Sequence, residues 1–203
     1  MVVIIDYGMG NLRSVQKAFE RIKVPVKVSS NTADILSADK LVLPGVGNFE
    51  KGMNNLKERN ISEALNQAVL INRKPILGIC LGMQLMTEFS EEGNCDGLGW
   101  IDARTQKFVF QSGELKIPHM GWNNLFINNF DSICKEVKSD HFFYFVHSYF
   151  ITCKDESNII SETIYGIKFV SSFRKDNIYG CQFHPEKSHD AGLLLLRNFA
   201  LIT

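Results

Sequence analysis

The chain has 203 residues, of which 45% are hydrophobic and 11% are aromatic, so it can fill a sizeable core and is not mainly disordered. Its 22 lysines and arginines balance its 22 aspartates and glutamates. Without an excess of positive charge, the chain lacks the usual means of holding nucleic acid or an anionic membrane surface, and we expect neither partner.

Short apolar runs alternate with amphipathic segments in the first half of the chain. Three runs predict buried strands, and these are Val2 to Ile5, Lys40 to Leu43 and Pro75 to Ile79. Apolar residues at helical spacing predict a helix from Leu12 to Ile22, capped by Asn11, and another from Ile61 to Val69. This alternation predicts an α/β fold with a mostly parallel sheet, helices on both faces, and ligands at the carboxyl ends of the strands.

The pattern changes from about Gly97 to Asp155, where aromatic and β-branched residues form extended runs. Three runs predict strands of an attached antiparallel β region, and these are Lys107 to Phe110, Trp122 to Ile127 and Phe142 to Thr152. The tail predicts a strand at Ile178 to Phe183 and a closing helix near Asp190 to Leu201, with Leu193, Leu196 and Phe199 or Ala200 facing inward. Because no repeat or linker interrupts the chain, we expect residues 1–203 to form a single domain.

Neither export nor membrane insertion is indicated by the apolar segments. The run before Asp6 is too short for the core of a signal peptide, and no run reaches the roughly 18 apolar residues of a membrane helix. The five cysteines are Cys80, Cys95, Cys134, Cys153 and Cys181. They contain no C-x-x-C pair, which argues against a disulfide framework and a zinc site. We therefore expect a cytoplasmic protein with free thiols, no metal and no cofactor.

The segment Gly78-Ile79-Cys80-Leu81-Gly82 has the G-x-nucleophile-x-G form of a nucleophile elbow. It follows a predicted strand and precedes a helix predicted at Met83 to Phe89. Glycines remove Cβ atoms that would clash in so sharp a turn, and the start of a helix favours a thiolate. A single cysteine is more often simply buried, so both interpretations remain open for Cys80 taken alone.

A thiol nucleophile needs a base, and His184 stands at the end of the last predicted strand, on the same edge of the sheet. Glu186 follows two residues later and is placed to orient the imidazole. The other histidines, which compete for this role, are His119, His141, His147 and His189. Neither His119 nor His147 has a carboxylate two residues away.

Two glycine-rich loops follow predicted strands. In Pro44-Gly45-Val46-Gly47, the backbone N–H of Val46 or Gly47 can join that of Leu81 to bind an oxyanion. In Gly8-Met9-Gly10-Asn11, Arg13 stands where a dinucleotide fingerprint needs its third glycine, so a tight turn is the better interpretation.

Three motifs in this order, over nearly the whole chain, resemble class I (triad) glutamine amidotransferases. They are Pro44-Gly45-Val46-Gly47, Gly78-Ile79-Cys80-Leu81-Gly82-Met83-Gln84 and Phe183-His184-Pro185-Glu186-Lys187-Ser188. Three more resemble the glutaminase subunits of imidazole glycerol phosphate synthase within that family. They are Asp6-Tyr7-Gly8-Met9-Gly10-Asn11-Leu12, Pro118-His119-Met120-Gly121-Trp122-Asn123 and Val146-His147-Ser148-Tyr149.

The resemblance implies a flavodoxin-like fold and the hydrolysis of glutamine to glutamate and ammonia through a γ-glutamyl thioester on Cys80. It gives His184 the role of base and then acid, with Glu186 as its orienting partner. It also implies that glutamine is held by Gly47, Gln84, Glu92 and the backbone of His147, Ser148 and Tyr149.

The resemblance further implies a heterodimer with a (β/α)8-barrel cyclase subunit, which receives the ammonia through an internal channel in histidine biosynthesis. A channel has a physical motive, because ammonia released into neutral water would mostly protonate and lose its nucleophilicity. The candidates for partner contacts are Asn11, Met120, Trp122 and Lys187, with Met120 to Asn123 expected to form a docking loop.

Three segments depart from the histidine-pathway pattern, and these are Leu85-Met86-Thr87, Gly99-Trp100-Ile101-Asp102-Ala103 and Lys187-Ser188-His189. They look closer to a paralogous branch that supplies ammonia for amidino groups on surface polysaccharide or flagellar sugars. A stand-alone thiol hydrolase and a non-catalytic binding module are the remaining alternatives. The histidine-pathway subunit and the surface-sugar paralogue share the glutaminase chemistry and differ in the molecule that accepts the ammonia.

Overall fold

The computed structural model describes residues 1–111 and 115–202. Its strands are β1 (Val2–Ile5), β2 (Val26–Ser29), β3 (Lys40–Leu43), β4 (Ile76–Ile79), β5 (Thr87–Ser90), β6 (Cys95–Asp96), β7 (Ile101–Lys107), β8 (His119–Asn124), β9 (Phe126–Ile127), β10 (Phe142–His147), β11 (Tyr149–Cys153), β12 (Ile159–Tyr165), β13 (Ile167–Lys175) and β14 (Ile178–Cys181). The α-helices are α1 (Leu12–Arg21), α2 (Thr32–Ser37), α3 (Phe49–Glu58), α4 (Ile61–Asn66), α5 (Leu81–Leu85) and α6 (His189–Leu201). A π-helical turn, η1 (Gln67–Ile71), and three 3-10 turns, η2 (Ser132–Cys134), η3 (Glu156–Asn158) and η4 (Pro185–Lys187), complete the described elements.

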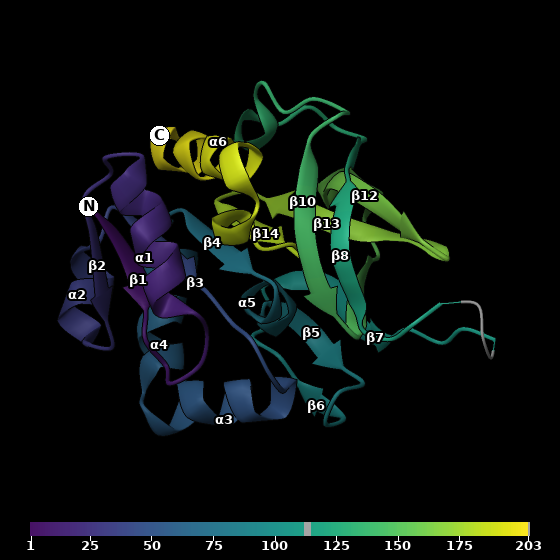
Figure 1. Cartoon of the computed structure of the whole chain (residues 1–203). Helices are drawn as coiled ribbons and strands as arrows, with labels where there is room; N and C mark the ends of the chain where they lie inside the picture. The colour runs from purple at the N-terminus through teal and green to yellow at the C-terminus, as the bar shows by residue number, and fades with distance from the viewer. Residues whose placement is uncertain (112–114, 203) are drawn as a thin grey trace.

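One mixed sheet forms the centre of the molecule (Figure 1). Its parallel half has the order β2-β1-β3-β4-β14, and β13, β11 and β7 continue it antiparallel, as predicted for an α/β fold with an attached antiparallel region. The separate ribbon of β8 and β10 crosses in front of this region in Figure 1. The chain is therefore an α/β protein with a mostly parallel first half.

The core lies on both faces of the parallel strands because successive residues of a strand point to opposite sides. Val3 and Ile5 pack in the cluster that includes residues of α3 and α4, whereas Val2 and Ile4 pack with residues of α1 and α6. All four side chains are at most 3% exposed. Within the described ranges, no helix combines the length and the apolar composition that a membrane crossing needs.

The neighbouring strands β4 and β14 position the site. They run parallel with Ile79 opposite Cys181, so both segments leave the sheet at the same edge. The N–H of Cys80 donates a hydrogen bond to the Cys181 carbonyl at 2.8 Å. The residue after β4 and the residues after β14 are thereby brought together although Cys80 and Gln182 are 102 residues apart in the sequence.

Several predicted boundaries are confirmed and others are wrong. The strands at Val2 to Ile5 and Lys40 to Leu43 have the predicted bounds. The helix predicted at Met83 to Phe89 is wrong, because α5 ends at Leu85 and Thr87 begins β5. The Thr87 hydroxyl donates to the Gln84 carbonyl at 2.8 Å, which ends the helix while β5 pairs with β7.

The antiparallel region also differs in detail from the prediction. The strand β7 ends at Lys107 rather than running from Lys107 to Phe110, because its pairing with β11 ends at Tyr149. The run from Phe142 to Thr152 is two strands separated at Ser148, since β10 pairs with β8 and β11 pairs with β7. The run from Trp122 to Ile127 is divided between β8 and β9. Met120 to Asn123 lies within β8 and is not a loop.

Candidate active site

Cys80 occupies a strained turn between β4 and α5. Its φ of 53° and ψ of −109° are uncommon for a residue with a side chain. A Cβ on Gly82 would lie 1.8 Å from the Leu43 carbonyl oxygen, and one on Gly78 would lie 2.7 Å from the Met83 nitrogen. Glycine is therefore required on both sides of the elbow, as the sequence predicts.

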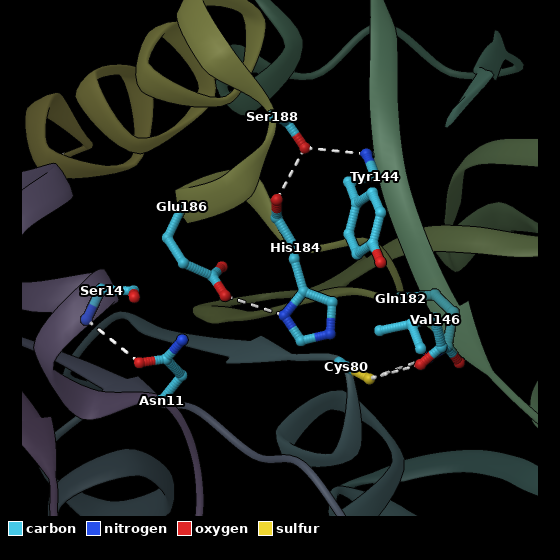
Figure 2. A network of polar contacts seen from close by, with 9 residues as sticks. All are labelled: Asn11, Ser14, Cys80, Tyr144, Val146, Gln182, His184, Glu186 and Ser188. Atoms are coloured by element: carbon cyan, nitrogen blue, oxygen red, sulfur yellow. Dashed lines mark hydrogen bonds and ion pairs between the residues drawn. The ribbon is translucent and has the colours of Figure 1, made fainter. Parts of the chain in front are cut away.

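His184 follows β14 and faces this thiol. Its Nδ1 lies 2.8 Å from the Glu186 Oε1, and both side chains are 1% exposed. The other ring nitrogen, Nε2, points toward Cys80 (Figure 2) and has no hydrogen-bonding partner among the described residues. Burial alone would lower the pKa of His184, but the negative charges of Cys80 and Glu186 raise it to about 10. This arrangement favours the protonated imidazolium form of His184.

The competing histidines are engaged elsewhere. His147 Nδ1 lies 2.7 Å from the acceptor-only Tyr149 carbonyl and therefore donates to it, which leaves Nε2 to accept from His119 Nδ1 at 3.0 Å. Burial lowers the pKa of His147 to about 3 and that of His119 to about 4. His141 Nδ1 accepts from the Lys138 N–H, and His189 stacks on Trp122. Among the pairs that the structure describes, His184 is the one histidine paired with a carboxylate.

A pocket of about 280 Å³ opens beside the Cys80 thiol. Its walls come from segments distant in sequence, and the lining residues are Val46, Gly47, Cys80, Leu81, Gln84, Glu92, Pro118, Val146, His147, Ser148 and Tyr149. Every residue predicted for the oxyanion hole or for holding glutamine is in this set. Glu92 also accepts a hydrogen bond from the Phe49 N–H at 2.7 Å, which ties the pocket wall to the start of α3.

The loop after β3 packs closely on the start of α5. A Cβ on Gly45 would lie 2.8 Å from the Gly82 nitrogen and 2.6 Å from the Tyr7 hydroxyl. Gly47 has a φ of 109°, a conformation that glycine adopts without strain. As the first residue of α5, Leu81 presents an N–H that the helix itself does not use. The loop and the helix start thus both bring backbone groups to the pocket.

Two residues at the site were missed from the sequence. Gln182 is fully buried, and its Nε2 donates to the Cys80 sulfur at 3.6 Å. Tyr7 is also fully buried, and burial, together with the charge of Cys80, raises its pKa. The sequence did contain one indication for Gln182. It lies two residues before His184, and side chains two residues apart in an extended segment point to the same side.

The four candidates for partner contacts differ in their surroundings. Asn11 caps α1, as predicted, and its Oδ1 accepts from the Ser14 N–H at 3.4 Å. Met120 is 62% exposed and Trp122 is 46% exposed, both on β8. Lys187 is exposed, with its Nζ 5.5 Å from the centre of the Tyr144 ring.

Metal binding has no candidate in the part of the chain that the structure describes, where no group of three or more His, Cys, Asp or Glu side chains is arranged to hold an ion. The reactive groups at the pocket are instead the thiol of Cys80, the imidazole of His184 that faces it and the carboxylate of Glu186 behind the imidazole, with backbone N–H groups nearby. Such a set suits nucleophilic attack on a carbonyl carbon, followed by proton transfer to the leaving group.

Comparison with known proteins gives concordant results. The family model "Glutamine amidotransferase class-I" matches residues 3–202. Imidazole glycerol phosphate synthase subunit HisH 1 of Campylobacter jejuni subsp. jejuni serotype O:23/36 (strain 81-176) is 51% identical over 201 residues, covering 98% of this chain and 99% of that protein. Subunit HisH 2 of the same synthase from Methanococcus maripaludis is 47% identical over 199 residues, covering 98% of each chain.

Solved structures show the same fold at lower identity. A glutamine amidotransferase aligns with a TM-score of 0.77 at 16% identity, covering 99% of this chain and 100% of that one. PurLQS from Thermotoga maritima aligns with a TM-score of 0.68 at 16% identity, covering 98% of this chain and 96% of that one.

Proposed function

We propose that this chain, which belongs to the class I glutamine amidotransferase family, is the glutaminase subunit of an imidazole glycerol phosphate synthase. It acts in histidine biosynthesis in the cytoplasm, and its residues 1–203 form one domain. The observation that carries the proposal is the Cys80 thiol, which lines the pocket and faces the His184–Glu186 pair. The relatives named as subunits of that synthase support the choice of acceptor pathway.

The reaction begins when the Cys80 thiolate attacks the side-chain amide carbon of glutamine. A carbon–sulfur bond forms, and the carbonyl oxygen becomes an oxyanion that accepts from the N–H of Leu81 and from an N–H of the Val46–Gly47 loop. His184 then gives its proton to the amide nitrogen, and ammonia leaves. The product of this half-reaction is a γ-glutamyl thioester on Cys80.

The second half-reaction uses the same groups in reverse. His184, now neutral, takes a proton from water, and the resulting hydroxide attacks the thioester carbon. The carbon–sulfur bond breaks, glutamate leaves and the thiolate returns. Glu186 holds the imidazole through Nδ1, so that Nε2 always faces the reacting atoms. Gln84, Glu92 and the His147 to Tyr149 segment hold the rest of the substrate in the pocket.

The ammonia passes to a (β/α)8-barrel cyclase subunit in a heterodimer. Two exposed apolar side chains on β8, Met120 and Trp122, support a docking surface beside the site, with Asn11 and Lys187 as further contacts. Because hydrolysis without an acceptor wastes glutamine, the isolated chain is expected to be repressed. Rotation of one peptide in the Val46–Gly47 loop would remove an oxyanion donor and cost about 10² to 10³ in rate.

The test is steady-state glutaminase activity of the purified chain, first alone and then titrated with the barrel subunit of imidazole glycerol phosphate synthase and its acceptor ligand. We expect low activity alone and strong activation by the barrel. Full activity in the lone chain, unchanged by both additions, would support a stand-alone hydrolase. Activation only by a barrel from a surface-sugar gene cluster would assign the other acceptor pathway.

A further inference from the structure

Besides His184, which faces the Cys80 sulfur, a second side chain lies against that atom and donates a hydrogen bond to it. Gln182 lies between β14 and the catalytic histidine, is fully buried, and directs its Nε2 at Sγ over 3.6 Å. Its Oε1 accepts from Gln84 Nε2 at 2.9 Å. A buried amide in contact with a nucleophile is a means of selecting one protonation state of that nucleophile.

The orientation of this amide is determined by a backbone carbonyl. Gln84 Nε2 has two protons, and it donates to the Tyr149 carbonyl at 3.1 Å as well as to Gln182 Oε1. Since a carbonyl can only accept, the NH₂ group of Gln84 must face Tyr149 and Gln182. Gln182 must then turn its oxygen toward Gln84 and its NH₂ group toward sulfur. The amide of Gln182 therefore cannot be reversed, because its orientation follows from the chain of hydrogen bonds through Tyr149, Gln84, Gln182 and Cys80.

The neighbours of the sulfur favour different forms of it. The Val146 carbonyl, 4.0 Å from Sγ, can bind only the protonated thiol, because it needs a donor. The Gln182 N–H donates to sulfur, and a donor binds a negatively charged acceptor more strongly than a neutral one. Figure 2 shows Gln182 and Val146 on the side of Cys80 away from Glu186. The direct amide contact is the shorter of the two.

We propose that Gln182 is a further catalytic residue, which donates a hydrogen bond to the Cys80 thiolate and whose orientation is set by Gln84. It stabilises the nucleophile before attack and the regenerated thiolate after the thioester is hydrolysed. This inference rests on the proposed function, because it needs Cys80 as the nucleophile. Gln84 is a positioning residue in this respect, in addition to lining the pocket.

The test follows the pH dependence of Cys80 alkylation by iodoacetamide in the full chain, from about pH 5 to pH 10, because alkylation reports the thiolate. Peptide mass spectrometry separates Cys80 from Cys95, which is only partly buried and serves as an internal control. Gln182→Met removes the N–H donor to the Cys80 sulfur and keeps a side chain of similar size. Gln182→Glu keeps the acceptor for Gln84 and turns an oxygen toward sulfur.

Other charged or titratable groups that face Cys80 stay in place in both variants. They are His184 with Glu186 behind it, Cys181 on β14, and Tyr7 after β1. Gln67→Met is a matched control, because Gln67 is exposed on η1 and its side chain donates a hydrogen bond to Asn72, away from Cys80 in the sequence. We expect the Cys80 profile to move up by about one pH unit in Gln182→Met, and further in Gln182→Glu.

With the barrel at saturation, we expect glutaminase kcat in Gln182→Met to fall about 10- to 100-fold with KM changed much less, since the contact is made to the reacting atom. An unshifted Cys80 profile in a folded Gln182→Met chain would overturn the role of Gln182. If that variant does not fold, the nearly isosteric Gln182→Glu decides by the same criterion. Glutaminase activity that survives Cys80→Ser would instead overturn the proposed function.

Discussion

The Ser188 hydroxyl accepts a hydrogen bond from the Tyr144 N–H at 3.0 Å and donates one to the His184 carbonyl at 2.6 Å (Figure 2). The His184 N–H in turn donates to the Tyr144 carbonyl at 2.8 Å. The strand β10 thus holds both ends of the turn that carries His184 and Glu186. Because β10 pairs with β8, which exposes Trp122, a partner that moves this ribbon would also move the histidine.

Ser188→Ala removes both hydrogen bonds of the Ser188 hydroxyl. The Tyr144 N–H and the His184 carbonyl each lose one hydrogen-bonding partner, at a position where Ser188 and His184 are buried. The free energy of unfolding should fall by about 1–3 kcal/mol, and glutaminase kcat should fall by about tenfold as the imidazole loses its position. Urea unfolding and steady-state kinetics with saturating barrel measure the two effects. The control is Ser37→Ala, which removes an exposed hydroxyl on α2. Equal behaviour of the two variants would contradict this prediction.

Cys80→Ser should lose turnover by about 10³-fold or more and keep its fold, because an alcohol is a much weaker nucleophile than a thiolate. Cys95→Ser is the matched control, since Cys95 lies on β6 and is not among the residues that line the pocket. Circular dichroism checks the fold, and glutamate release in the barrel complex checks turnover. Comparable losses in both variants would show that Cys80 has no special role.

His184→Ala should be less active than Glu186→Gln. Removing the imidazole leaves no group to protonate the leaving ammonia. In Glu186→Gln, an amide oxygen can still contact His184 Nδ1, where the carboxylate oxygen Oε1 of Glu186 lies 2.8 Å from it. Single-turnover measurements with glutamine separate thioester formation from its hydrolysis and should show both steps slowed in His184→Ala. The reverse ranking of the two variants would mean that His184 is not the base.

Acid should destabilise the protein through its buried neutral histidines. Their folded pKa values, about 3 for His147 and about 4 for His119, lie below the ordinary value of 6.5. The unfolded chain therefore binds more protons than the folded one as the pH falls below 6.5, and stability is lost progressively down to about pH 3. Urea unfolding across this range should show a shallower loss in His147→Gln than in the parent chain. The surface variant Gln67→Met, which changes no titratable group, should retain the full slope, and a slope unchanged in His147→Gln would refute the account.

Trp122→Ala should weaken binding of the barrel subunit by about tenfold or more, because large, partly exposed aromatic side chains dominate protein interfaces. Trp122 is held flat against His189, with ring centres 4.9 Å apart and planes at 3°, so little side-chain entropy is lost when it docks. Titration calorimetry measures the affinity. Phe130→Ala is the control, since Phe130 is 81% exposed and follows β9. The same affinity in both variants would remove β8 from the docking surface.

Features governed by neighbours in sequence were predictable. The strand at Val2 to Ile5, the cap at Asn11 and the elbow around Cys80 depend on local apolar runs, one side-chain cap and two glycines. The pairing of His184 with Glu186 is local too, since the residues are separated only by Pro185. A structure was not required to nominate these residues, because the atoms that hold them lie within a few residues along the chain.

Other features depend on contacts between segments that the chain places far apart. The end of α5 was predicted four residues too late, at Phe89 instead of Leu85, because pairing of β5 with β7 overrides the helical preference of those residues. The nitrogen of His147 that the nearby Tyr149 carbonyl leaves as an acceptor is paired with His119, which comes from another strand. The direction of the Gln182 amide is decided by Gln84 and Tyr149, 98 and 33 residues away. Local sequence thus determined which candidate groups the site contains, whereas the tertiary structure decided their orientation and protonation, because these depend on buried partners that only folding brings within hydrogen-bonding distance.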